Sequence, residues 1–87
     1  MTQDEVISKA RERGWTLTAD RKAYQLVREP VLFAVSRDVG ESILCTESHD
    51  GELRAESLSS PRIALEWIEE KTVLVRVGER AVSRRAR

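Results

Sequence analysis

The dipeptide Asp50-Gly51 lies between two runs of residues that favour β-strands. A type I′ turn requires φ > 0 at both central residues, and Asp-Gly adopts that conformation at little steric cost. The stretch Ser42–Leu58 therefore predicts a β-hairpin with Asp50-Gly51 as its two-residue loop. This motif constrains the fold more than any other short motif in the chain. Besides the turn itself, a two-residue loop fixes which residues face each other across the two strands.

The predicted register pairs His49 with Glu52, Glu47 with Arg54, Cys45 with Glu56, and Ile43 with Leu58. Side chains alternate along a strand, so all of these residues share one face of the ribbon. The opposite face carries only uncharged residues: Leu44, Thr46, Ser48, Leu53, Ala55 and Ser57. We expect the uncharged face to pack on the core and the charged face to lie in water, with a cross-strand ion pair between Glu47 and Arg54.

The N-terminal residues predict a helix over about residues 3–13. Thr2 and Glu5 form a capping box, apolar residues recur at helical spacing, and Gly14 suits the position after the helix. A short strand is expected to follow from Trp15 to Thr18. Residues 19–29 fit either a helix or a hairpin; we favour the hairpin, with Asp20-Arg21-Lys22 as its turn.

The run Val31–Val35 is continuously apolar and β-rich, which predicts a central strand buried on both faces. Ser60-Pro61 predicts the start of a second helix, which we place over about residues 61–71. Residues 72–77 then predict a strand, followed by a turn at Gly78 and a tail that pairs back on it. The expected fold is a single small α+β domain with an antiparallel sheet of roughly four to six strands.

The composition narrows the class of protein. A chain of 87 residues with one cysteine forms one domain without an internal disulfide. It contains no apolar run long enough to cross a membrane, and its first residues do not form a signal peptide. We therefore expect a cytoplasmic protein that has no membrane partner.

The charges are segregated although the net charge is zero. Residues 41–56 carry five acidic residues against Arg54 alone, a balance of −4, whereas residues 72–87 carry five arginines against Glu79, a balance of +4. Such blocks provide surfaces for partners of opposite charge.

Cys45 and His49, with Glu47 between them, invite interpretation as a metal site or a nucleophilic pair. On a strand, however, residues four apart are separated by roughly 13 Å, too far to share a metal ion or a proton. The four glycines are isolated, so the chain has no phosphate-binding loop. We expect no catalytic residues, no metal site, no cofactor and no enzymatic activity.

The leading hypothesis is a non-enzymatic interaction module that docks on a larger protein or nucleoprotein and modulates or inhibits it. Small, motif-free chains with segregated charge are typical of phage and mobile-element inhibitors such as anti-CRISPR proteins. The predicted partner-binding residues form the acidic face of the hairpin: Glu47, His49, Asp50, Glu52 and Glu56. Spaced carboxylates on a rigid ribbon favour docking on a basic surface.

The alternative hypothesis is a nucleic-acid-binding accessory domain. Its predicted contacts are the arginines of the C-terminal segment: Arg76, Arg80, Arg84, Arg85 and Arg87. Binding through arginines and phosphates would weaken steeply with salt. A homodimer, formed by the two charge blocks or by an edge strand, is the third possibility.

Overall fold

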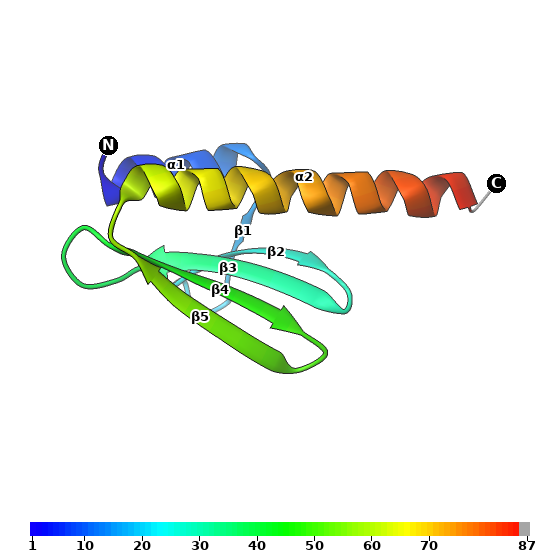
Figure 1. Cartoon of the computed structure of the whole chain (residues 1–87), viewed down its shortest axis with the longest axis horizontal. Coiled ribbons are helices and arrows are strands. Elements are labelled where there is room, and N and C mark those ends of the chain that lie inside the picture. The colour runs from blue at the N-terminus through cyan, green and yellow to red at the C-terminus, as the bar shows by residue number, and fades with distance from the viewer. Residues whose placement is uncertain (86–87) are drawn as a thin grey trace.

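The computed structural model describes the backbone of residues 1–85 and the side chains of residues 1–77. The elements follow the order α1 (Gln3–Glu12), β1 (Thr16–Leu17), β2 (Tyr24–Arg28), β3 (Val31–Arg37), β4 (Ile43–His49), β5 (Glu52–Leu58) and α2 (Pro61–Arg85). The five strands form one antiparallel sheet in sequence order, with β3 in the centre. Both helices cover the same face of this sheet (Figure 1). The predicted α+β class is confirmed.

The predicted N-terminal helix is confirmed as α1. The Thr2 hydroxyl accepts a hydrogen bond from the backbone N–H of Glu5 at 3.3 Å, as a capping box requires. Gly14 follows the helix with φ of 88°, a conformation that favours glycine. Val6 and Ala10 are fully buried and fix α1 to the sheet.

Residues 19–29 form a hairpin, as the favoured interpretation predicted. The turn between β1 and β2 is held by Asp20, which accepts hydrogen bonds from the Thr18 hydroxyl and from the backbone N–H of Lys22. These bonds lower the pKa of the Asp20 carboxyl, with the Thr18 hydroxyl as the largest cause. β3 is central as predicted, but it is buried on one face only, because no described element covers the other face.

The second helix begins where it was predicted. The Ser60 hydroxyl accepts from the backbone N–H of Ile63 at 3.5 Å, and Pro61 is the first helical residue. The predicted end at Lys71 is wrong, and so are the strand over 72–77 and the terminal hairpin. α2 continues through all of these positions to Arg85 and projects beyond the end of the sheet (Figure 1).

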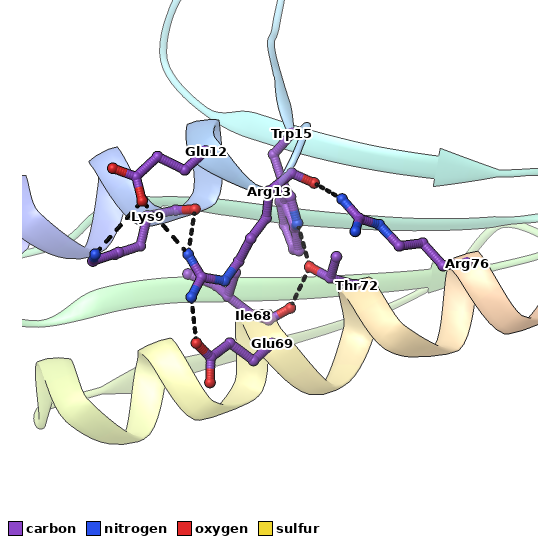
Figure 2. A network of polar contacts seen from close by, with 8 residues as sticks. All are labelled: Lys9, Glu12, Arg13, Trp15, Ile68, Glu69, Thr72 and Arg76. Carbon is purple, nitrogen blue, oxygen red and sulfur yellow. Dashed lines mark hydrogen bonds and ion pairs between the residues drawn. The ribbon is translucent and has the colours of Figure 1, made fainter.

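Burial at helical spacing explains this extension. Ala64, Ile68, Thr72 and Val75 are all buried, which places one continuous stripe of α2 on the core. The Thr72 hydroxyl donates to the backbone carbonyl of Ile68 at 2.7 Å and accepts from the Trp15 indole N–H at 2.9 Å (Figure 2). The β-branched residues that suggested a strand cost a helix only about 0.5 kcal/mol each, which this burial outweighs.

Polar contacts join the end of α1 to the middle of α2 (Figure 2). The Arg13 guanidinium donates to the Glu69 carboxylate at 2.5 Å and to the backbone carbonyl of Lys9 at 3.1 Å. The Arg76 guanidinium donates to the backbone carbonyl of Arg13 at 3.1 Å. These bonds satisfy the carbonyls at the end of α1 and hold the two helices side by side.

Candidate interaction surface

The β4–β5 hairpin has the predicted turn and register. Asp50 and Gly51 adopt φ of 49° and 87°, as a type I′ turn requires. The four predicted cross-strand pairs are all present: His49 with Glu52, Glu47 with Arg54, Cys45 with Glu56, and Ile43 with Leu58. The hairpin is therefore an uninterrupted ribbon, and the positions of its side chains follow from alternation alone.

The direction in which the ribbon faces was predicted wrongly. Ile43 and Cys45 belong to the charged face, and they are 0% and 2% exposed because α2 packs over them. The uncharged face points away from both helices, where Leu53 is 68% exposed. The charged residues beyond Cys45 stay accessible because the hairpin splays away from α2 toward its turn (Figure 1).

Glu47 has an ion-pair partner that was not predicted. Its carboxylate lies 3.4 Å from the Lys71 ammonium of α2, and no ion pair with Arg54 forms, although the two residues face each other. The Lys71 ammonium also lies 5.5 Å from the Phe33 ring centroid and 5.7 Å from that of Trp67. Glu47 is thus neutralised by a cation that two aromatic rings hold in place.

Lys71 and Trp67 are the site residues that the sequence interpretation missed. Lys71 was predicted only as the last residue of the second helix, and Trp67 was given no role in binding. Their spacing of four along the helix was the available signal, because it places both side chains on the same side of α2. That side faces β4 and β5 once the helix lies across the sheet.

The hairpin tip, defined here as His49–Glu52, carries two exposed acidic groups. Asp50 and Glu52 are exposed, and no described residue forms an ion pair with either. His49 is also exposed and lies 3.5 Å from the Glu47 carboxylate. The Asp50 backbone N–H donates to the Pro30 carbonyl at 3.3 Å, which attaches the tip to the β2–β3 turn.

A groove of about 420 Å³ separates β5 from α2. Trp67 and Lys71 line its helix side, and Arg54 and Glu56 line its strand side. The predicted acidic residues therefore fall into two groups. Glu47 and Glu56 line a groove that also contains two cations, whereas Asp50 and Glu52 project from the tip.

Cys45 lies at the base of this groove with its thiol protonated. Burial is the main cause that raises the pKa of the Cys45 thiol to about 12, and the nearby Glu56 carboxylate adds to it. A thiol of this kind is a poor nucleophile and a poor metal ligand. Among the described side chains, those of residues 1–77, no three His, Cys, Asp or Glu cluster closely enough to bind a metal ion.

The predicted arginine site lies on the C-terminal half of α2 rather than on a strand. Arg76 donates to the end of α1, as described above. Arg80, Arg84 and Arg85 belong to the helix, but their side chains lie outside the described residues, as does Arg87 entirely. The structure therefore places Arg76, Arg80, Arg84 and Arg85 along one helix and describes side-chain contacts for Arg76 alone.

The sheet face opposite the helices is open and uncharged. Its positions follow from the strand registers. They are Thr16, Gln25, Val27, Leu32, Ala34, Ser36, Leu44, Thr46, Ser48, Leu53, Ala55 and Ser57. Serines, threonines and one glutamine intersperse the apolar residues on this face.

Comparisons with known proteins give no relative: no family model matches, and no curated protein and no solved structure shows significant similarity. Within the part of the chain that the structure describes, neither helix combines the length and the apolar character of a membrane span.

Proposed function

We propose that this chain is a non-enzymatic protein-interaction module. It docks its hairpin tip on a basic surface of a larger protein or nucleoprotein, and in doing so modulates or inhibits that partner. The observation that carries the proposal is the pair of exposed carboxylates, Asp50 and Glu52, at the end of a rigid hairpin.

The structure favours the tip over the groove as the acidic contact. In the groove, Lys71 compensates the charge of Glu47, so a basic partner gains little from that carboxylate. The exposed Glu56 shares the groove with the cationic Arg54. Asp50 and Glu52 keep their charge available, and the type I′ turn and the bond to Pro30 hold their backbone. A preorganised loop loses little conformational entropy on binding, and exposed charge accelerates encounter with an oppositely charged surface.

The test is a quantitative pull-down from nuclease-treated host lysate with the combined variant Asp50→Asn and Glu52→Lys. Asparagine tolerates the positive φ of position 50, so the turn is preserved. The control variant, Glu41→Gln and Glu66→Lys, makes the same charge change at exposed positions away from the tip.

We expect the tip variant to lose a protein partner that the wild-type chain and the control variant both retain. Circular dichroism of the three chains serves to check that each is folded. Equal capture of the partner by the tip variant and the wild-type chain would reject the tip as the docking site.

A second candidate function is nucleic-acid binding by the arginines of α2. The observation in its favour is that Arg76, Arg80, Arg84 and Arg85 lie on one helix that projects beyond the sheet. Binding of mixed DNA and RNA should then weaken by orders of magnitude between low and moderate salt. The variant Arg80→Glu and Arg84→Glu should abolish this binding; unchanged binding would exclude this function.

A further inference from the structure

β5 is a long, unpaired edge of the sheet. In the described part of the chain it pairs with β4 alone, and every residue from Glu52 to Ser57 is exposed. The opposite edge is β1, which has only two residues. Proteins usually protect an edge with charged side chains, proline, a bulge or a very short strand. Of these devices, β5 has only the charged side chains of Glu52, Arg54 and Glu56. β5 contains neither proline nor glycine, and its register with β4 runs without a bulge over seven pairs.

The hairpin register shows which backbone groups are free on this edge. In a two-residue hairpin the closing pair, His49 and Glu52, is hydrogen-bonded, and bonded pairs then alternate with non-bonded ones. Glu52, Arg54 and Glu56 therefore direct their N–H and C=O groups toward β4. Leu53, Ala55 and Ser57 direct theirs outward, and each presents one donor and one acceptor to another strand.

The charges on β5 alternate in a way that complements a second copy of the same strand. Glu52, Arg54 and Glu56 lie on the groove side of the strand. When two β5 strands run antiparallel with Ala55 opposite Ala55, Arg54 of each copy faces Glu56 of the other. These are non-hydrogen-bonded pairs, in which cross-strand side chains lie closest and interact most strongly.

Neighbouring registers lack this complementarity. A register centred on Arg54 places that residue opposite itself and Glu52 opposite Glu56. A register centred on Glu56 places two glutamates in contact and leaves Arg54 opposite Leu58. Like charges directly opposite each other are destabilising, so the charge pattern disfavours both of these registers. A register centred on Leu53 also pairs Arg54 with a glutamate, Glu52, but only three residues of β5 overlap in it. All seven residues of β5 overlap in the register centred on Ala55, which is therefore favoured.

We propose that this chain self-associates through β5, with a twofold axis perpendicular to the sheet at Ala55. Leu53 and Ser57 exchange backbone hydrogen bonds with Ser57 and Leu53 of the second copy, and Ala55 with its own equivalent. The two sheets join into one, with the helices of both copies on the same face. This assembly goes beyond the proposed function and uses a different pair of side chains, Arg54 and Glu56, instead of Asp50 and Glu52.

The test is sedimentation velocity over a wide concentration range with four full-length chains: wild type, Arg54→Glu, Glu56→Arg, and the double charge swap. Each single variant turns both symmetric ion pairs into repulsions and should weaken self-association roughly tenfold or more. The double swap restores both pairs in reverse and should associate like the wild type. Mixing the two single variants should also give a dimer, because a chain with two glutamates at positions 54 and 56 then faces a chain with two arginines there.

Amide hydrogen exchange provides an independent, residue-specific readout. In the assembled wild-type protein the N–H groups of Leu53, Ala55 and Ser57 should exchange slowly, and in the Arg54→Glu variant they should exchange fast. The N–H groups of Glu52 and Glu56, which bond to β4 in either state, should remain protected in both and report that the hairpin is intact.

A wild-type protein that remains monomeric throughout the concentration range would overturn the proposal. So would a dimer that both single variants form as well as the wild type, since it would use another surface. Failure of the tip variant in the pull-down leaves these measurements unaffected, so the two proposals stand or fall separately.

Discussion

The hydrogen bond from Trp15 to Thr72 yields the sharpest stability prediction. Thr72 is 5% exposed and Trp15 is 3% exposed, and the indole N–H lies 2.9 Å from the threonine hydroxyl (Figure 2). Thr72→Val keeps the shape of the side chain and removes the only acceptor that the described residues offer this N–H. The bond joins α2 to the segment between α1 and β1, so its loss also tests whether α2 continues past Lys71.

The expected loss of stability follows from what happens to the Trp15 indole N–H after the substitution. Thr72→Val opens no cavity because the volume is retained, so the main cost is a buried donor without an acceptor. That cost is about 1–3 kcal/mol of the free energy of unfolding. For a domain of this size, each kcal/mol lowers the melting temperature by about 4–8 °C.

The assay is urea unfolding followed by tryptophan fluorescence and circular dichroism, arranged as a double-mutant cycle with Trp15→Phe. Phenylalanine has no N–H, so Thr72→Val should cost less in that background, with a coupling energy of about 1 kcal/mol or more. Thr16→Val on the exposed edge strand β1, where the hydroxyl makes only a long hydrogen bond of 3.5 Å to the Gln25 carbonyl, is the matched control and should change stability by less than about 0.5 kcal/mol. A coupling energy near zero would refute the assignment of this bond as a stabilising contact.

Three further predictions concern the hairpin and its surroundings. Lys71→Met should lower the free energy of unfolding by about 1–2 kcal/mol, because Glu47 loses its counter-ion and two rings lose a cation; adding Glu47→Gln should recover part of it. Ser57→Ala should raise the pKa of Asp38 toward 3.8 in an NMR titration, because the Ser57 hydroxyl is the main group that lowers it. The stabilisation from that lowered pKa is present above pH 3.8 and is lost as the pH falls. Cys45 should react with a thiol reagent at neutral pH only after unfolding, because it is buried and protonated.

Local chemistry made the hairpin predictable from the sequence. Asp50-Gly51 determines a turn type, the turn determines the register, and the register determines which residues face each other. The capping box at Thr2 and the pair Ser60-Pro61 were predictable for the same reason, because a few neighbouring residues determine where each helix starts. None of these inferences requires knowledge of distant contacts.

Tertiary contacts decided the features that the sequence interpretation missed. Charge density alone suggested that the face with Glu47 and Glu52 lies in water, but Ile43 and Cys45 share that face and bury its first half. The β-branched run after Lys71 resembled a strand until its burial against the sheet was known. The ion pair between Glu47 and Lys71 depends both on which way the hairpin faces and on how α2 packs against the sheet, so the sequence alone could not predict it.

The bond between Trp15 and Thr72 also bears on the order in which the protein folds. Each strand pairs with the strand next to it in sequence, so the sheet needs only short loops to close. The Trp15–Thr72 contact spans 57 positions, and closing so long a loop costs more entropy than closing any of the hairpins. On the ribosome, all five strands are also synthesised before α2. Until residues 61–75 are made, core residues of the sheet such as Phe33 and Cys45 lack the cover that α2 provides.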